Sequence, residues 1–279
     1  MVTNTHPTQQ PTFAVIGATG KTGRRVADLL ESRGHAVRRL ARGTSRRFDW
    51  EQPDGWARAL DGVDRLYVAY VPDLAAPGAD VVITRLTEVA REAGVQRIVL
   101  LSGRGELGAR RCEEIVLGSG IPSTVVSAGW FIQNFTEGML AGALETGVLA
   151  LAAGDAREPF VDVDDIAAVA IEALTGDGHA GRRYEVSGPE SLTFTEVAAL
   201  LTELSGRDVQ YVPMTFDDFH AAVAAEAGPE TATLLTELCR EVFDGRNETP
   251  ADGVRQVLGR EPRDMRAVLA EALTAEQRA

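Results

Sequence analysis

The sequence has few of the residues that build metal and disulfide sites. Its two cysteines, Cys112 and Cys239, are far apart and show no C-x-x-C spacing, and its four histidines form no H-E-x-x-H or comparable cluster. A zinc site or a redox-active cysteine pair is therefore not expected, because both need closely spaced ligands or thiols. Both cysteines lie in helix-like segments, and we interpret them as buried thiols.

Long hydrophobic runs and an excess of positive charge are also missing. No apolar stretch approaches the roughly 20 residues that cross a bilayer, and the polar residues 1–12 lack the apolar stretch of a secretory signal. The net charge of −13 argues against nucleic acid as a partner, since a phosphate backbone attracts a basic surface. We therefore expect a cytoplasmic monomer or homodimer whose partner is a small molecule, with no membrane or nucleic acid involved.

Short apolar runs alternate with helix-length segments over the first half of the chain. Strands are predicted at residues 13–17, 36–42, 65–71, 97–103 and 123–129, and helices at 22–33, 56–61, 78–93 and 109–118. This alternation is typical of βαβ units with right-handed crossovers, which build a parallel sheet. The predicted fold class is α/β, a Rossmann-type doubly wound parallel sheet with a smaller, mostly helical C-terminal lobe.

The second half of the chain shows a looser pattern. A helix is predicted near residues 135–146, and Asp164 is predicted to cap a helix that begins close to it. A late strand is expected at residues 183–188. Thr193 and Glu196 are then spaced as a capping box at the start of the next helix.

The segment "GATGKTG" at residues 17–23 contains two competing phosphate-binding patterns. Its "GKT" ends a nucleoside-triphosphate P-loop, but that motif needs a glycine five positions before Gly20, where the chain has Val15. Gly17, Gly20 and Gly23 instead match the dinucleotide pattern, in which they allow a tight turn, close approach of the pyrophosphate and helix packing. Amide groups at the helix start would hold the diphosphate. The predicted contacts are Gly17, Thr19, Gly20, Lys21, Thr22 and Gly23.

The end of the second predicted strand distinguishes between the two dinucleotides. An NAD site offers a carboxylate to the ribose 2′-hydroxyl about 20 residues after the glycines, whereas this chain has Arg42 there, within five arginines between residues 38 and 47. A guanidinium grips a 2′-phosphate with paired hydrogen bonds. NADP(H) is therefore favoured, and the alternative for Arg38, Arg39 or both is that they are solvated residues at a strand edge.

We accordingly divide the chain into three parts. These are a flexible tail (1–12), an NADP-binding Rossmann domain (13–155) and a C-terminal substrate-binding lobe (156–279) that is interleaved with the core.

Four segments carry a family resemblance: "GATGKTGRRV", "FDW" at 48–50, "SGIPSTVVSAGWFIQNF" at 119–135 and "PFVDVDDIAAVA" at 159–170. Together they resemble the NmrA-like atypical short-chain dehydrogenases/reductases, especially the ergot-alkaloid-type reductases and NAD(P)H:quinone oxidoreductases, over most of residues 13–270. The resemblance implies an adenine pocket near Asp49 and Trp50. It also implies a nicotinamide site lined by Tyr70, Ser102, Gly129, Trp130 and Phe131, with Asn134 facing the substrate cleft.

The chain departs from this family at the proton donor. Typical short-chain dehydrogenases carry a Tyr-x-x-x-Lys pair on the helix after the fourth strand, where the tyrosine protonates the developing alkoxide. The segment after Ser102, "GRGELGARRCEEIVLGSG", contains neither residue. The His-x-x-Glu of many NmrA-like relatives is also altered, since Arg110 stands before Glu113. Ser102 is left as the catalytic candidate, although a serine hydroxyl is a poor acid.

Two functional hypotheses follow. The first is an NADPH-dependent reductase that transfers hydride to a carbonyl of a small aromatic or polycyclic metabolite, a ketoreductase of antibiotic-biosynthesis type assisted by a phenol of its substrate. Within this reductase hypothesis, an iminium ion or a quinone is an alternative hydride acceptor. The second is a non-catalytic, NADP(H)-sensing regulator that binds another protein.

Aromatic and apolar residues beyond the Rossmann core favour the reductase, because they suit a roof over a flat ligand. The same residues are equally consistent with packing of the lobe itself. They are Tyr211, Met214, Phe216, Phe219 and Phe243. The expected substrate contacts are Tyr70, Phe131, Asn134 and Phe216.

Overall fold

A computed structural model describes residues 10–138 and 140–276 of the chain. Residues 1–9 of the predicted tail lie outside the described part. Within that part, no helix is long and apolar enough to cross a membrane.

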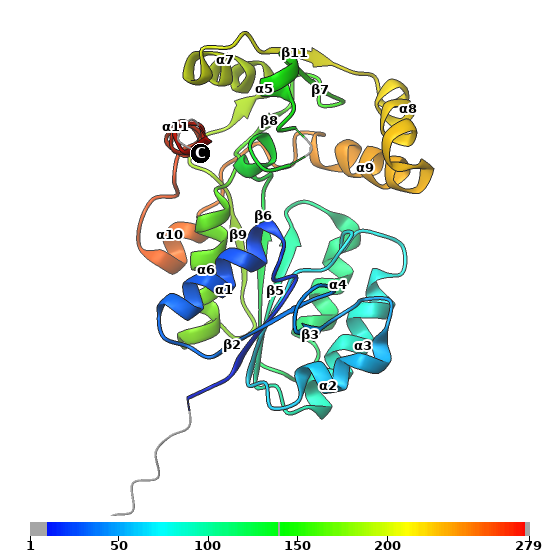
Figure 1. Cartoon of the computed structure of the whole chain (residues 1–279), viewed down its shortest axis with the longest axis vertical. Coiled ribbons are helices and arrows are strands. Elements are labelled where there is room, and N and C mark those ends of the chain that lie inside the picture. The colour runs from blue at the N-terminus through cyan, green and yellow to red at the C-terminus, as the bar shows by residue number, and fades with distance from the viewer. Residues whose placement is uncertain (1–9, 139, 277–279) are drawn as a thin grey trace, which may run out of the picture.

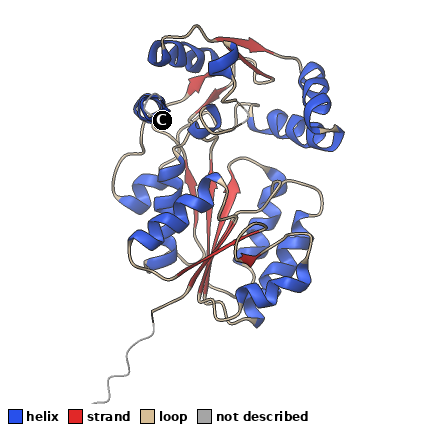
Figure 2. Cartoon of the chain, in the orientation of Figure 1, coloured by secondary structure: helices blue, strands red, loops and turns tan. Residues whose placement is uncertain are grey.

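The described residues form a central sheet of seven parallel strands (Figures 1 and 2). In spatial order the strands are β3 (Arg46–Arg47), β2 (Val37–Ala41), β1 (Phe13–Ile16), β4 (Arg65–Val68), β5 (Arg97–Gly103), β6 (Ser123–Ala128) and β9 (Arg183–Val186). The chain runs outward from β1 to β3 and returns beside β1 as β4. At such a switch point the carboxyl ends of the strands leave a crevice for a ligand. The α/β doubly wound prediction is confirmed.

Helices cover both faces of the sheet because its central strands are apolar on both sides. One face carries α1 (Lys21–Ser32), α6 (Val163–Thr175) and α10 (Gly253–Leu258); the other carries the 3₁₀ turn η1 (Pro53–Gly55), α2 (Trp56–Leu60), α3 (Ala79–Glu92) and α4 (Leu107–Leu117). Phe13 and Val15 pack against the first layer, whereas Ala14 and Ile16 pack against the second. This period of two is what a strand buried on both faces requires.

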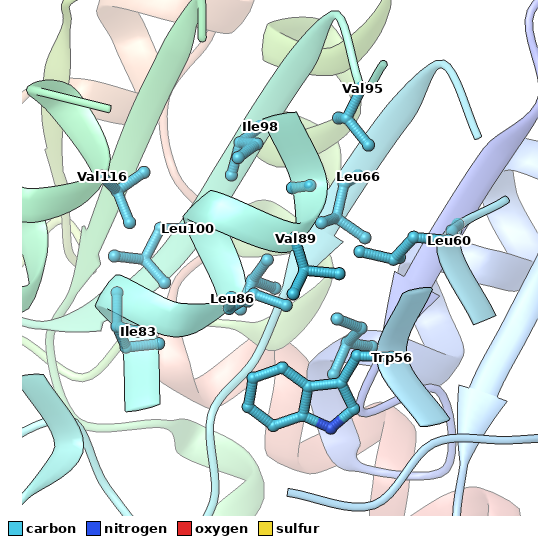
Figure 3. Packing of buried hydrophobic residues seen from close by; sticks show 14 of the residues in the cluster. Trp56, Leu60, Leu66, Ile83, Leu86, Val89, Val95, Ile98, Leu100 and Val116 are labelled. Atoms are coloured by element: carbon cyan, nitrogen blue, oxygen red, sulfur yellow. The ribbon is translucent and has the colours of Figure 1, made fainter. Parts of the chain in front are cut away.

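The core beneath α2 and α3 is built around Trp56. Figure 3 shows Trp56 beside side chains of α3, which pack onto those of β4 and β5. Ile83 and Leu86 face Leu66 and Leu100, and all of these side chains are 2% exposed or less. This layer fixes β4 and β5, whose carboxyl ends border the site described below.

The remaining elements form a smaller lobe over the carboxyl ends of the strands (Figure 1). They are η2 (Ile132–Phe135), α5 (Ala143–Thr146), β7 (Val148–Leu151), β8 (Arg157–Glu158), β10 (Leu192–Thr193), α7 (Phe194–Ser205), β11 (Gln210–Pro213), α8 (Phe216–Ala227), α9 (Pro229–Val242) and α11 (Met265–Glu276). β7 pairs in parallel with β11, and β8 pairs antiparallel with β10. The lobe has its own apolar cluster, centred on Phe135, Phe160 and Phe194.

Two local predictions for the second half are wrong. The helix predicted at 135–146 is reduced to the short η2 and α5, because Gly138 and Gly142 weaken a helix interior. The N-cap of α6 is Asp162, whose Oδ1 accepts the N–H of Asp164 at 3.1 Å, so Asp164 lies inside the first turn. By contrast, the predicted late strand is present as β9 and the capping box at Thr193 is confirmed.

Candidate active site

The glycine loop after β1 makes a tight turn into α1. Gly17 has a φ of +79°, which glycine adopts at little cost, and the Gly20 N–H donates to the Gly17 carbonyl oxygen at 2.9 Å. A Cβ added at Gly23 would lie 2.2 Å from that same oxygen. The turn therefore exists only with glycine at the third position, as the dinucleotide pattern predicts.

The start of α1 offers free backbone donors to an anion. Within the described residues, no side chain caps Gly20 and no acidic residue lies in the first turn. The first N–H groups of a helix have no partner inside it, and the helix dipole adds positive potential there. A pyrophosphate supplies the acceptors and the negative charge that this helix start lacks.

Lys21, the only lysine in the sequence, stands at this helix start. Its Nζ donates to Asn134 Oδ1 at 3.0 Å, which links the glycine loop to the segment after β6. Burial lowers the pKa of Lys21, although the nearby Glu137 charge opposes this shift. Two predicted site residues from distant parts of the sequence are thus in direct contact.

A cavity of about 240 Å³ lies between the carboxyl ends of β5 and β6 and the helices α8 and α9. We call it the β5–β6 cavity. Six predicted site residues line it: Lys21, Ser102, Gly129, Trp130, Phe131 and Asn134. The opposite wall is apolar and comes from the lobe: Phe219, Leu235, Leu238, Cys239 and Val242.

Ser102 carries an unsatisfied hydroxyl on the wall of this cavity. The residue is 4% exposed, and its Oγ has no hydrogen-bond partner among the described residues. A buried polar group left unpaired costs about 1–3 kcal/mol, so this position favours a ligand that supplies a partner. The carboxamide of a nicotinamide ring, which carries both a donor and an acceptor, fits that requirement.

A second cavity, of about 700 Å³, lies at the carboxyl ends of β1 and β2. We call it the β1–β2 cavity, and its lining includes Gly17, Thr19, Arg42, Asp49, Trp50 and Tyr70. The Trp50 and Tyr70 rings meet edge to face, with centroids 4.8 Å apart. Tyr70, which the resemblance placed at the nicotinamide and the substrate, therefore lies with the residues implied for adenine.

The arginine cluster between residues 38 and 47 divides into two groups. Arg38 donates to two carbonyl groups at the end of α2, and Arg39 pairs with two carboxylates of α1, so both have structural partners. Arg47 pairs with Asp49 at 2.8 Å and holds the pKa of that carboxyl below its usual range. Arg42 is exposed on the lining of the β1–β2 cavity and makes no hydrogen bond or ion pair to another described residue.

The predicted roof is partly corrected by the structure. The Phe216 ring packs beneath the Arg240 guanidinium, 4.1 Å from it, and it is Phe219, three residues further along α8, that lines the β5–β6 cavity. The Phe243 ring packs against Trp130, with centroids 4.7 Å apart. Both cysteines are free and buried, as predicted. Cys239 lines the cavity, and burial raises the pKa of its thiol to about 12.

Sequence reasoning missed two carboxylates, Asp73 and Glu106, which also line the β5–β6 cavity. Each follows the carboxyl end of one of two neighbouring strands, β4 and β5. The carboxyl ends of parallel strands meet at one edge of a sheet, so this spacing was a usable signal. Glu113, in contrast, is buried in an ion pair of 2.5 Å with Arg183 and stands outside the cavity lining.

This fold and these two cavities define a class of dinucleotide-dependent oxidoreductases. A family model described as NAD(P)H-binding matches residues 17–177, more than half of the chain. The chain belongs to this family, the NmrA-like atypical short-chain dehydrogenases/reductases, and is an NAD(P)H-dependent oxidoreductase. The predicted family and coenzyme class are confirmed.

Three similar proteins illustrate the range of this family. The (4-alkanoyl-5-oxo-2,5-dihydrofuran-3-yl)methyl phosphate reductase of Streptomyces griseus is 34% identical over 92% of this chain and 96% of its own length. The NAD(P)H azoreductase of Xenophilus azovorans is 32% identical over 80% and 85%. The NADPH-dependent quinone oxidoreductase QOR2 of Escherichia coli is 26% identical in sequence. Its crystal structure matches this fold with a TM-score of 0.75, over 94% of this chain and 98% of that one.

Glu158 lies directly behind the cavity wall and should make stability depend on pH. The residue is fully buried, its Oε1 accepts the Trp130 N–H at 3.2 Å, and burial raises the pKa of the carboxyl from 4.5 to about 7 against the opposing charge of Arg104. Its proton therefore stabilises the fold fully below pH 4.5, and this contribution is lost as the pH rises to about 7.

Glu158→Gln keeps the neutral shape at every pH, so it should remove this dependence. Relative to the variant, the wild type should lose about 3 kcal/mol of unfolding free energy between pH 4.5 and 7. Urea unfolding of both proteins at several pH values measures the difference. The matched control is the exposed Glu190→Gln. If the unfolding free energies of wild type and Glu158→Gln change in parallel with pH, the raised pKa of Glu158 is contradicted.

Proposed function

We propose that the protein is an NADPH-dependent reductase that transfers hydride to a carbonyl of a small aromatic or polycyclic metabolite. The observation that carries the proposal is the β5–β6 cavity, in which the unsatisfied Ser102 hydroxyl lies opposite an apolar wall from α8 and α9. A polar edge facing an apolar wall suits a flat acceptor with one reactive oxygen.

The residues present fit NADP(H). We assign the pyrophosphate to the start of α1, the adenine to Asp49, Trp50 and Tyr70, and the 2′-phosphate to Arg42. The nicotinamide is assigned to the wall made by Ser102 and Gly129–Phe131. When bound, the reduced coenzyme supplies a hydride, that is, a hydrogen with an electron pair. The chain's own task is to hold the acceptor against that ring and to exclude water, and orientation alone is worth about 7–11 kcal/mol in the best cases.

Conjugated carbonyl compounds are the favoured acceptors. The relatives named above act, by their names, on a furanone phosphate, an azo compound and a quinone, and all three are conjugated. A phenolic ketone of two or three rings combines conjugation with the apolar surface that Phe219 and Leu238 would cover. Quinones and cyclic iminium ions are alternatives for the same cavity.

The test is NADPH consumption with a panel of phenolic polycyclic ketones, quinones and cyclic iminium ions. We expect turnover of at least one carbonyl class, and titration calorimetry should show NADPH binding in the absence of acceptor. Binding of NADPH without turnover of any panel member would contradict the reductase and favour the NADP(H)-sensing regulator.

Arg42→Ala should weaken NADPH binding and leave NADH binding unchanged. Arg42 has no competing ion pair in the described structure, and a hydrogen bond to a charged group contributes about 1.5–3 kcal/mol. The dissociation constant of NADPH should therefore rise roughly 10- to 100-fold. Calorimetry with both coenzymes measures the effect, with the exposed Arg91→Ala as the control. If the dissociation constants of NADH and NADPH change equally, Arg42 does not bind the 2′-phosphate.

A further inference from the structure

The β5–β6 cavity holds a pair of carboxyl groups that the coenzyme assignment does not use. Asp73, after β4, and Glu106, before α4, both line this cavity together with Ser102. The Glu106 carboxyl lies directly over the backbone of Gly103, because a Cβ added at Gly103 would stand 2.0 Å from Glu106 Cδ and 2.0 Å from its Oε1. The glycine therefore makes the room in which this carboxyl lies.

Glu106 is not needed by the helix that it precedes. It occupies the N-cap position of α4, yet within the described structure its side chain makes no capping hydrogen bond. The Leu107 N–H donates instead to Glu241 Oε1 of α9, at 2.9 Å. Glu106 Oε2 is buried and accepts no hydrogen bond from a described donor, while the Glu106 carboxyl lies within hydrogen-bond reach of the Asp73 carboxyl. This carboxyl and the Ser102 hydroxyl, which has no described partner, thus line the same cavity.

Asp73 sets the protonation of the pair. Burial raises the pKa of the Asp73 carboxyl, while the Ala75 N–H, which its Oδ1 accepts at 2.7 Å, and the hydrogen bond with Glu106 act against this shift and favour ionised Asp73. Two adjacent buried carboxyls cannot both ionise readily, so the proton belongs on Glu106.

The other charges around Glu106 act in the same direction. Burial raises the pKa of Glu106 well above 4.5, and the charge of Asp73 and those of Glu241 and Glu113 raise it further. Lys21, the cation among the lining residues, is held by Asn134. Arg246 pairs with Glu241, and Arg183 pairs with Glu113.

We propose that Glu106 is the proton donor of this reductase and that Asp73 is the positioning residue that keeps it protonated, an inference that rests on the proposed function. As hydride from NADPH bonds to the carbonyl carbon, the C=O π electron pair moves to the oxygen. That oxygen takes the Glu106 proton and leaves a carboxylate, which solvent reprotonates before the next turnover. The carbonyl is reduced to an alcohol and NADPH is oxidised to NADP⁺, so Glu106 takes the place of the missing tyrosine.

Glu106→Gln tests this assignment, because glutamine keeps the shape but donates no acidic proton. With a ketone or quinone acceptor, kcat should fall roughly 10²- to 10⁴-fold, with little change in KM. With a cyclic iminium ion, which needs no proton on the accepting atom, kcat should stay within about threefold of wild type, since no general-acid contribution is lost. Ser102→Ala should lower kcat for the ketone much less than Glu106→Gln does. The matched control is Glu114→Gln, on the exposed face of α4.

A second measurement does not depend on turnover. The infrared spectrum of coenzyme-free Glu158→Gln, which lacks the Glu158 carboxyl and its raised pKa, should contain near neutral pH the C=O stretch of a protonated carboxyl. This band should disappear when Glu106→Gln is added. When Asp73→Asn is added instead, this band should titrate at lower pH, because the neighbouring charge is gone.

The outcomes separate this inference from the proposed function. If wild type reduces a ketone and Glu106→Gln does so equally fast, Glu106 is not the donor while the reductase proposal stands. If NADPH binds but no acceptor is reduced, the reductase proposal fails. Absence of the protonated-carboxyl band from Glu158→Gln overturns the Glu106 assignment even if Glu106→Gln does not fold.

Discussion

Gly23→Ala is expected to abolish useful coenzyme binding. The new Cβ would lie 2.2 Å from the Gly17 carbonyl oxygen and 2.6 Å from its carbon. Both are backbone atoms, so no side-chain rotation relieves the overlap, and either the turn or the start of α1 must move. Either movement shifts the amide groups that we assign to the diphosphate, and overpacking destabilises a fold by about 1–3 kcal/mol. Calorimetry with NADPH and thermal unfolding measure the two effects.

The control for this experiment is Gly55→Ala. A Cβ at Gly55 meets no atom within 4 Å, and the residue already has a helical backbone conformation, with φ of −83° and ψ of −14°. This variant should bind NADPH as wild type does. If Gly23→Ala also retains wild-type affinity, the loop after β1 does not hold the pyrophosphate in the way that we assign.

Trp56→Ala should lower the free energy of unfolding by about 3–5 kcal/mol, the range for deleting a large aromatic side chain from a core. Trp56 is 2% exposed, stacks on Phe48 at 5.4 Å and meets Trp50 edge to face at 5.7 Å. Its Nε1 donates to the Asp49 carbonyl oxygen at 2.7 Å. Alanine leaves a cavity and an unpaired carbonyl, so the urea midpoint should fall.

The same substitution should reach the coenzyme through the β1–β2 cavity. Trp50 and Asp49, which we assign to adenine, both rest on Trp56, so NADPH affinity should fall together with stability. Trp56→Phe, which retains an aromatic ring, should recover most of the stability but not the indole hydrogen bond. If Trp56→Ala lowers the free energy of unfolding by less than about 1 kcal/mol, the surrounding core has collapsed to fill the space left by the side chain.

The parts of this structure that the sequence predicts are those with local causes. The strands beginning at Phe13 and Arg97 follow from runs of apolar residues. The loop from Gly17 to Gly23 follows from a steric requirement within seven residues, and the capping box at Thr193 depends on a neighbour three residues away. In each case the residues that form the element also contain the interactions that cause it to form.

The parts that the sequence does not predict depend on distant contacts. The helix expected at 135–146 is weakened by Gly138 and Gly142, and Gly138 also lies against Lys21, a neighbour over a hundred residues away that a local pattern does not show. Phe216 and Phe219 are indistinguishable by composition, and only the packing of α8 on α9 decides which ring reaches the β5–β6 cavity. The meeting of Asp73 and Glu106 likewise depends on the adjacency of β4 and β5.

The hydrogen bond from Leu107 to Glu241 ties the lobe to the sheet at the mouth of the cavity. Because Glu241 belongs to α9, lifting that helix would bare the start of α4 and withdraw a negative charge from Glu106. The pKa of Glu106 would then fall. Glu106 would therefore bind its proton less tightly with the lobe open than with the lobe closed. One movement of α9 would then control both the entry of a substrate and the protonation of Glu106.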